Sequence, residues 1–587
     1  MKKKILYLGL SLLLVAVLVP SSLLVSSCTS TTSTSVVTTS TSSTASTTTA
    51  NEPQYGGTLT VFNYWGNGDP SDFDAQLTQQ PWKTSVWDEP FLEWLVVGNV
   101  EQYGPRGNNA FAFQEIQVVP EQYLGGGLAD SWEITTNPLA FTFHIHKGIM
   151  WTGNTKIGMA PRELIADDVV ASNIRANAAP MVANIFTFVK DIHATDRYTV
   201  VWDLNSFDAL WSLYMSGSSG CIMAPESIKA GAADWTNAVG TGPFIITDYT
   251  SGAECTYTRN KNYWGKTTIN GKEYQLPFVN TLVFPIIPDE SAEIANLRTG
   301  KIDWWPNVPT TYASSLKSSS PDLVQNNYLS GNVQVFRMNR IDSQYLKIKE
   351  VRQALMMATD LQTISNLVYG GGPIYSWPVA QGDPAYTPLQ DLPASTQALF
   401  TYDTTKAQQM LADAGFPSGF TTTITVKSDA VQQDIATLVA GDWAKVGVKA
   451  SIITLDPTAF TATWANRSYT GVIAWTYSAF NPLASMGNVD PTGQAATYAA
   501  GEPFIDMWKK ADQETDPVAR SADEKQEALA LMDDVGWIPF ADPYSLNCYW
   551  PWIKNYYNEV EAGYINYMPM INTMWIDPNV KKNLGYQ

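Results

Sequence analysis

The sequence YDTTKAQQMLADAGFP at residues 402–417, followed by TTTITV at residues 421–426, carries the pattern of one helix and then one extended segment. Asp403 is a residue type that caps helix N-termini. Apolar residues then recur along one helix face, at Ala407, Met410, Leu411 and Ala414. Gly415 and Pro417 predict the end of the helix, because glycine adopts a left-handed backbone and proline cannot continue the helix.

The same alternation of helix and strand recurs elsewhere in the chain. Asp289 is the expected N-cap of a helix that stops at Gly300 and has an apolar side made of Ala292, Ile294 and Ala295. Residues 302–304 then resume as a strand, and residues 57–62 alternate like an opening strand. This order predicts an α/β fold with mixed sheets. Because the chain has 587 residues, more than one core usually organises, two or three lobes are expected.

The composition excludes one class of partner and favours another. The formal net charge is -19, and an acidic surface repels phosphate backbones, so we expect no nucleic-acid partner. The chain holds 21 Trp and 28 Tyr residues, whose rings suit both cores and ligand pockets.

The N-terminus predicts export. Three lysines at positions 2–4 precede an apolar run from Ile5 to Val19, and Val25-Ser26-Ser27 leads into Cys28. This resembles the lipobox of bacterial lipoproteins, with Val in place of the usual Leu. It implies a signal peptide at 1–27 and a lipid anchor on Cys28. The alternative is an uncleaved membrane helix from Ile5 to Val25. Both interpretations place the body outside the cytoplasm.

Residues 28–54 are expected to form a flexible tether. Of the 22 residues from 29 to 50, 18 are Ser or Thr, a composition that cannot bury enough apolar surface to fold. Beyond Cys28, only Cys221, Cys255 and Cys548 remain, so at most one internal disulfide is expected. Cys221 with Cys255 is a plausible pair outside the cell, although spacing alone does not establish it.

A set of short motifs resembles, in order, the landmarks of the family 5 extracellular solute-binding proteins, whose best-known members bind oligopeptides and dipeptides. The motifs are GGTL at 56–59, LADSW at 128–132, FTFHIHKG at 141–148, ADDV at 166–169, TGPF at 241–244, RN at 259–260, NYWG at 262–265, RTGKID at 298–303, VRQAL at 351–355 and the helix at 402–417. Each motif is weak alone, but their conjunction in this order is specific.

The resemblance implies a bilobal clamp of the periplasmic-binding-protein type with an extra inserted subdomain. The first lobe would span residues 55–325 and 541–587, with the insertion at about 97–225, and the second lobe would span 326–540. Ligand would be enclosed between the lobes and delivered to the permease subunits of an ABC importer. The resemblance further implies a monomer without a cofactor.

The resemblance places the expected ligand-binding residues in one segment of the chain. In peptide-binding members, an Asp three residues after a Trp holds the ammonium group of the ligand. Here the corresponding run is WTYSAFNP at 475–482, and Ser478 stands where the Asp would be. A hydroxyl carries no charge, so the expected anchor for a peptide amino terminus is missing.

Trp475 and Tyr477 are the first candidates for ligand contact, with Ser478 and Asn481 as hydrogen-bonding neighbours. Alternation along a strand turns the two aromatic residues and Ser478 to different sides. Further aromatic candidates, for which packing under a loop is the alternative, are Trp65, Trp377 and, after them, Trp464. Flat rings also stack on sugars, so an oligosaccharide-binding member of the same family is the alternative to a peptide-binding one.

Other functional classes find less support. His144 and His146 share one face of an expected strand, but no third ligand is evident and His193 is isolated, so we expect solvent-facing or structural histidines and no metal. The sequence has no GxSxG, HExxH or P-loop motif. A secreted glycoside hydrolase with dispersed carboxylates is the alternative from another class, and catalytic turnover distinguishes it from a binding protein. An adhesion component would predict repeats, which are not evident.

Overall fold

The computed structural model describes residues 52–62, 68–77, 86–114, 119–179, 186–217, 220–478, 482–489, 498–499 and 501–586. Pro53–Gln587 forms one compact unit. The predicted leader, the lipidation of Cys28 and the candidate site residues Trp65 and Asn481 lie outside the described residues. Among the described helices, none is both long and apolar enough to cross a membrane.

Two large hydrophobic cores organise the compact unit. The first holds buried residues from Leu59 to Tyr328 and again from Leu546 to Ile576, and the second holds residues from Val333 to Phe540. We call the parts of the chain around these cores the first lobe and the second lobe. Leu483 and Ala511, which lie within the sequence of the second lobe, pack into the first core.

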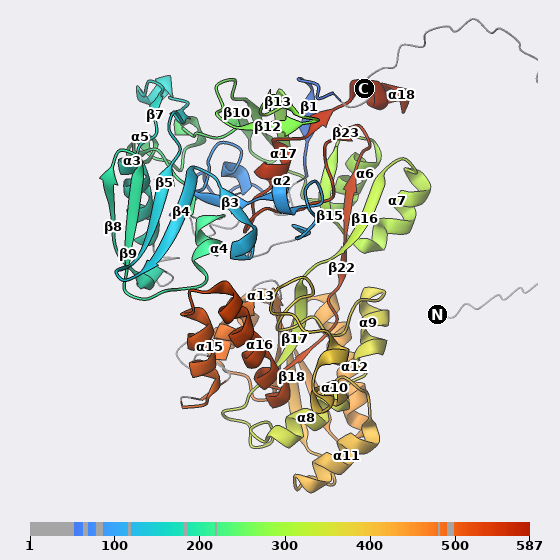
Figure 1. Ribbon diagram of the computed structural model, residues 1–587. Helices are drawn as coiled ribbons and strands as arrows, with labels where there is room; N and C mark the ends of the chain where they lie inside the picture. The colour runs from blue at the N-terminus through green and yellow to red at the C-terminus, as the bar shows by residue number, and fades with distance from the viewer. Residues whose placement is uncertain are drawn as a thin grey trace, which may run out of the picture. The chain divides into compact units, whose positions relative to one another are not determined.

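The first lobe contains three sheets of three or four strands (Figure 1). One has β1 parallel to β14 and the remaining pairs antiparallel: β1 (Thr58–Thr60), β14 (Thr281–Pro285), β11 (Glu254–Arg259) and β10 (Phe244–Thr250). The second is antiparallel throughout: β4 (Ala129–Thr136), β5 (Leu139–Ile145), β9 (Thr199–Leu204) and β8 (Val189–Asp196). The third is β15 (Trp304–Val308), β22 (Tyr544–Tyr549) and β16 (Val324–Leu329).

Four two-stranded ribbons complete the strands of this lobe: β2 (Val96–Gly98) with β3 (Leu124–Gly126), β6 (Met150–Trp151) with β7 (Arg162–Glu163), β12 (Lys266–Ile269) with β13 (Lys272–Gln275), and β23 (Ile553–Lys554) with β24 (Trp575–Ile576). Its helices are α2 (Val100–Tyr103), α3 (Ala166–Asn177), α4 (Trp211–Met215), α5 (Pro225–Ala230), α6 (Glu290–Arg298), α7 (Ala313–Ser319), α17 (Met568–Ile571) and α18 (Pro578–Asn583). Helix α3 packs against β8 and β9.

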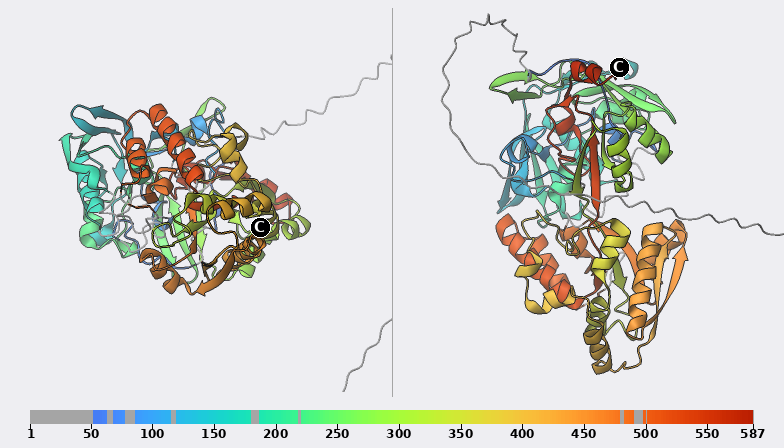
Figure 2. Two further views of the ribbon diagram at one scale, coloured as in Figure 1. Left: turned by 90° about the horizontal axis from the view of Figure 1, so that it is seen from below. Right: turned by 90° about the vertical axis from the view of Figure 1, so that its right-hand side faces the viewer.

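The second lobe is built on one five-stranded mixed sheet. Its order is β19 (Lys449–Leu455), β18 (Thr421–Lys427), β20 (Val472–Ser478), β17 (Asn332–Met338) and β21 (Trp537–Pro539). Strand β18 is parallel to both of its neighbours, whereas β17 is antiparallel to β20 and to β21. The helices are α8 (Lys349–Met357), α9 (Leu361–Tyr369), α10 (Ala394–Leu399), α11 (Thr404–Asp413), α12 (Ala430–Lys445), α13 (Pro457–Ala465), α14 (Pro482–Met486), α15 (Phe504–Asp512) and α16 (Pro517–Asp534). Helices α15 and α16 lie side by side (Figure 2).

The chain passes between the cores twice, after β16 and after β21, and one buried carboxyl group ties the two crossings together. Asp542 Oδ1 accepts hydrogen bonds from the backbone N–H of Gly331 (2.8 Å) and from Ser330 Oγ (3.3 Å). The backbone N–H of Ser330 also donates to the carbonyl of Pro543 (2.9 Å). The crossings therefore run side by side, joined through one oxygen of Asp542, while its buried Oδ2 has no hydrogen-bond partner among the described residues.

Several predicted elements are confirmed at their ends. Helix α11 has Asp403 as its N-cap, whose side chain accepts from the backbone N–H of Lys406, and helix α6 has Asp289 in the same role. Strand β18 covers the predicted extended run. The opening strand is shorter than expected, because only Thr58–Thr60 pairs with β14, and β15 begins at Trp304 rather than at residue 302.

The predicted Cys221–Cys255 disulfide is not formed. Cys221, Cys255 and Cys548, the cysteines of the described residues, are all free thiols and all buried. Cys255 lies on β11 between Tyr249 on β10 and Phe284 on β14, so its neighbours belong to the sheet. Burial raises the pKa of the Cys255 and Cys548 thiols to about 12, which keeps them protonated.

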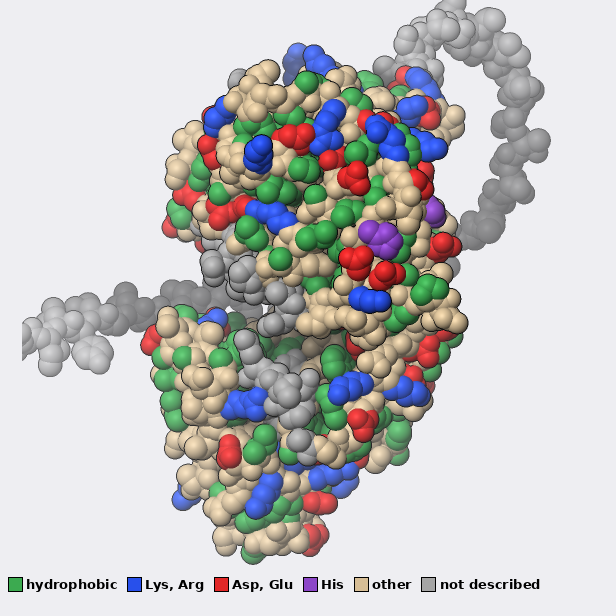
Figure 3. Space-filling model, turned by 90° about the vertical axis from the view of Figure 1, so that its left-hand side faces the viewer, with side chains coloured by type: hydrophobic (Ala, Val, Ile, Leu, Met, Phe, Trp, Pro, Cys, Tyr) green, Lys and Arg blue, Asp and Glu red, His purple; other side chains and the backbone are tan. Residues whose placement is uncertain are grey.

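The negative charge is not gathered into one patch on the face drawn in Figure 3. On that face, Asp and Glu side chains are interspersed with Lys and Arg side chains. The negative charge of the chain, -19 in total, is therefore not concentrated at one place on that face.

Candidate functional site

The segment carrying the predicted ligand-binding residues forms β20, in the interior of the second-lobe sheet. In the antiparallel register with β17, Ser478 lies opposite Asn332, and Tyr477 opposite Val333. Alternation places Trp475 and Tyr477 on one face of the sheet and Ser478 on the other, as expected. The structure therefore brings the two aromatic residues to one face without bringing Ser478 to them.

Trp475 belongs to an aromatic stack with two residues of α13. Its ring centroid lies 4.0 Å from that of Trp464 and 5.8 Å from that of Phe460, and both pairs are within 8° of parallel. Trp475 and Trp464 are half-buried, and the indole Nε1 of Trp464 has no hydrogen-bond partner among the described residues. The stack is thus a partly accessible aromatic surface with an unused donor.

Tyr477 and Trp377 are core residues in this structure. The Tyr477 side chain is buried, its hydroxyl accepts a hydrogen bond from Arg337 Nη1 (3.0 Å), and burial raises its pKa. Trp377 is 1% exposed, and its ring lies 4.9 Å from that of Trp537. Both rings pack within the second core, as the alternative named for Trp377 expects, and ligand contact by either residue stays a prediction.

A cavity of about 60 Å³ is lined by both lobes, and we call it the interlobe cavity. The first lobe contributes Pro120, Glu121, Gln122, Ala209, Leu210 and Ser212. The second lobe contributes Asp383, Pro384, Pro482, Leu483, Pro517, Arg520, Ser521 and Glu524. Pro482 and Leu483 follow the β20 segment closely, and Ser485 Oγ donates to the carbonyl of Ser478 (2.7 Å).

Direct contacts join the lobes beside this cavity. Arg520 Nη2 donates to Glu121 Oε2 (2.8 Å), and the guanidinium also lies 5.7 Å from the ring centroid of Phe207. The backbone N–H of Ala209 donates to the carbonyl of Asp512 (2.9 Å). Because Arg520 and Glu121 are both largely buried, their ion pair is less screened than a surface pair.

Carboxyl groups gather around the interlobe cavity. Glu524 and Asp383 line it, and burial raises the pKa of Glu524 to about 8 and that of Asp383 to about 6. Burial, together with the neighbouring Glu524 and Asp512, raises the pKa of Glu527 to about 9. Burial also raises the pKa values of Asp208 and Asp512, which face each other across the lobes. Around the interlobe cavity, carboxyl groups therefore outnumber basic side chains.

The residues of this site were not predicted from the sequence. Helix α16 carries Asp523, Glu524 and Glu527, and charged residues on an amphipathic helix are expected to face the solvent. All three are buried. The available signal was their spacing, since residues three and four apart share one face of a helix.

A larger cavity of about 310 Å³ lies within the first lobe, beside Glu93. Glu93 Oε1 accepts from Tyr263 Oη (2.9 Å) and Oε2 accepts from Trp264 Nε1 (3.0 Å). Burial raises the pKa of Glu93 to about 7, opposed by these hydrogen bonds. We call this space the first-lobe cavity. Residues of a single lobe line it, and both oxygens of its carboxyl group are satisfied.

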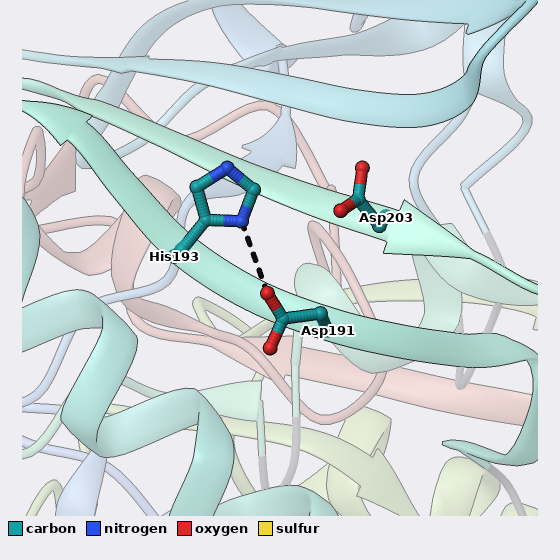
Figure 4. A group of neighbouring side chains, drawn as sticks. All are labelled: Asp191, His193 and Asp203. Carbon is teal, nitrogen blue, oxygen red and sulfur yellow. Dashed lines mark ion pairs between the residues drawn. The ribbon is translucent and has the colours of Figure 1, made fainter.

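Two of the histidines lie near carboxyl groups in this structure. His146 Nδ1 lies 2.6 Å from Asp130 Oδ1, and His144 is exposed. His193 is not isolated, contrary to the prediction, because it lies near Asp191 and Asp203 on β8 and β9 (Figure 4). The ligand atoms of these three residues all lie within 4.8 Å of one another, so the group could hold a metal ion, although exposed acidic groups of this kind are common without one.

Comparison with known proteins gives a consistent result. The model of the family described as bacterial extracellular solute-binding proteins, family 5 Middle, matches residues 124–497. The chain is 29% identical over 467 residues to heme-binding protein A of Haemophilus influenzae, covering 73% of this chain and 81% of that protein. It is 26% identical over 514 residues to the dipeptide-binding protein of Escherichia coli, covering 80% and 87%.

A solved structure with the same fold is the ABC transporter-associated periplasmic binding protein DppA of Helicobacter pylori in complex with the peptide STSA. It superposes with a TM-score of 0.64 at 20% identity, covering 89% of this chain and 98% of that one. The predicted bilobal binding-protein fold is confirmed by this similarity.

Proposed function

Because the chain belongs to the bacterial extracellular solute-binding proteins of family 5, we propose that it captures a solute between its two lobes and delivers it to the permease subunits of an ABC importer. The observation that carries this proposal is the interlobe cavity, which side chains of both lobes line and which the Arg520–Glu121 ion pair spans. A solute that binds at this cavity contacts both lobes at once and stabilises their association.

The proposed ligand is an oligopeptide or dipeptide. Support comes from the dipeptide-binding protein of Escherichia coli, which matches most of the chain, and from the fold shared with a peptide complex. Ser478 supplies no charge for a peptide amino terminus, so another acid has to hold it. The stack of Trp475, Trp464 and Phe460 supplies an aromatic surface for an apolar side chain or, in the alternative, for a sugar ring.

We further propose that the protein acts without covalent chemistry. Members of the family are substrate-binding proteins, and the raised pKa values at the interlobe cavity are accounted for by burial and mutual repulsion of carboxyl groups. Mass spectrometry of candidate ligands after incubation with the protein is expected to show no product. Hydrolysis of a glycoside would instead establish the alternative, a secreted glycoside hydrolase.

The proposed location is the outer face of the cell membrane. A lipid on Cys28 and a tether over 28–54 would hold a monomeric body whose lobes span 55–325 with 541–587, and 326–540, with the inserted subdomain at about 97–225. Expression of Cys28→Ser tests the anchor. We expect this variant to leave the membrane fraction, whereas retention of the variant in the membrane contradicts lipid anchoring.

A thermal-shift screen tests the function. Because a ligand that binds only the folded state raises its melting temperature, the purified chain is screened against peptides of two to five residues and against oligosaccharides. Peptides are expected to raise Tm in a concentration-dependent manner. A shift with oligosaccharides alone would replace peptide by sugar as the ligand class.

A further inference from the structure

Glu524 is a buried carboxyl group at the interlobe cavity. It lies on α16, is 6% exposed and lines the interlobe cavity. With the described residues, its side chain forms neither a hydrogen bond nor an ion pair. Buried carboxyl groups are normally paired, so this group is left without the donor that its burial requires.

The neighbouring acids do not supply that donor. Asp383, which also lines the cavity, accepts one hydrogen bond from the backbone N–H of Ala385 (2.7 Å). Glu527, fully buried on the next turn of α16, has no partner for either oxygen among the described residues. Across the lobes, Asp208 and Asp512 add two further carboxyl groups.

The cations near the cavity are already engaged. Arg520 bonds to Glu121 and to the carbonyl of Glu514, and Lys510 pairs with Asp523 at 2.6 Å. Lys525 acts on Asp383 only through its charge. Arg520 lines the cavity, and its charge favours the ionised form of Glu524, although its hydrogen bonds to described residues go elsewhere. The cavity is therefore lined by more carboxyl groups than cations, at the boundary that a captured solute would occupy.

We propose that the interlobe cavity binds the primary ammonium group of the ligand, with the carboxylates of Glu524 and Asp383 as its acceptors. This inference rests on the proposed function. It assigns to Glu524 and Asp383 the ammonium binding that an Asp at position 478 would perform in peptide-binding members of the family. The volume of about 60 Å³ suits an ammonium group rather than a whole peptide. The apolar walls suit the adjoining carbon atoms: Pro120, Leu210, Pro384, Pro482, Leu483 and Pro517.

Binding is then linked to proton release. With a pKa of about 8, Glu524 is mostly protonated at neutral pH, and an arriving ammonium group favours its ionised form. Affinity rises as pH increases from 6 towards 8, because less work is needed to remove the proton. Above about pH 8 the α-amino group of a peptide loses its own charge, and affinity falls again.

Titration calorimetry on the full chain tests this inference with trialanine and N-acetyl-trialanine. We expect the acetylated peptide to bind the wild type at least about 30-fold more weakly, as loss of one partner of a buried charge pair does. Glu524→Gln should weaken trialanine binding by a similar factor and leave the acetylated peptide unaffected. Asp506→Asn, which removes an exposed carboxylate from the neighbouring helix α15, is the matched control and should change neither affinity.

Equal binding of both peptides by the wild type, or unchanged discrimination in Glu524→Gln, overturns the proposal. If the variant does not fold, the wild type alone decides, since trialanine binding in buffers of different ionisation enthalpy should release protons at pH 7. An absence of proton release contradicts the inference. If neither peptide binds, the proposed peptide function fails. The ammonium site is then tested with n-butylammonium. A larger rise in the Tm of the wild type than in that of Glu524→Gln supports the site, and an equal rise contradicts it.

Discussion

Two buried glutamates, each beside a cavity, differ in how their charge is satisfied. Glu93 in the first-lobe cavity accepts hydrogen bonds from Tyr263 and Trp264, so its environment is complete without a ligand. Glu524 in the interlobe cavity forms no hydrogen bond or ion pair with the described residues, and Arg520 acts on it only through its charge. The comparison teaches that burial of an acid does not by itself mark a binding site. The informative feature is a buried carboxyl group at the boundary between two lobes whose oxygens accept no hydrogen bond from the described residues.

The largest expected effect is on the pH dependence of stability. The pKa values of Glu524 and Glu527, about 8 and about 9, exceed the ordinary 4.5, so in this range the folded chain holds protons that the unfolded chain has lost. The free energy of unfolding of the ligand-free protein should therefore fall as pH rises from 5 to 8. Each group contributes up to about 1.4 kcal/mol per pH unit.

Urea unfolding at pH 5, 6, 7 and 8 measures this slope. Glu524→Gln should make the slope shallower, because the variant has no proton to lose at that position. An identical slope in the variant and the wild type would show that Glu524 is not the raised group.

The next largest effect is expected at Glu93. Glu93→Ala leaves the Tyr263 hydroxyl and the Trp264 indole N–H without their acceptor, which should lower the free energy of unfolding by about 3 kcal/mol. Glu93→Gln retains one acceptor oxygen and should cost about 1 kcal/mol. By contrast, Glu524→Gln should cost nothing at pH 7, as measured by urea unfolding. A large loss in Glu524→Gln would mean that this residue, too, is structural.

Trp475→Ala is expected to weaken ligand binding by about 2 kcal/mol, as loss of a buried aromatic anchor often does. Thermal melting of the ligand-free variant separates this effect from the lost stacking on Trp464 and Phe460. Unchanged affinity would remove Trp475 from the site and leave the interlobe cavity as the main contact.

The smallest effect is expected from the pair that joins the lobes. Arg520→Leu should weaken ligand binding by about 1 kcal/mol, because the ligand then has to bring the lobes together without the bond to Glu121. A double-mutant cycle with Glu121→Gln measures the coupling between the two side chains. Strictly additive effects would show that the pair does not support the bound state.

The sequence predicted those parts of the fold that depend on local patterns. The N-caps at Asp403 and Asp289 were found because capping uses residues within one helical turn. The family was found because its motifs are contiguous and ordered. The inward direction of Tyr477 was not predicted, since which face of a strand meets the core depends on the packing of distant helices.

The candidate site was beyond sequence reasoning for a physical reason. Glu121, Asp208, Asp383 and Glu524 are separated by more than 80 residues at each step and meet only after both lobes have folded. The Cys221–Cys255 disulfide was predicted for the same reason, because the sequence does not show which residues surround each cysteine in the folded chain. In the structure, each thiol is buried among its own neighbours.

The most direct test of the central claim is a crystal structure of the protein with bound trialanine. Peptide density is expected between the lobes, with the ammonium nitrogen within hydrogen-bonding distance of the Glu524 and Asp383 carboxylates. Density beside Glu93 in the first-lobe cavity, with the interlobe cavity unchanged, would contradict it.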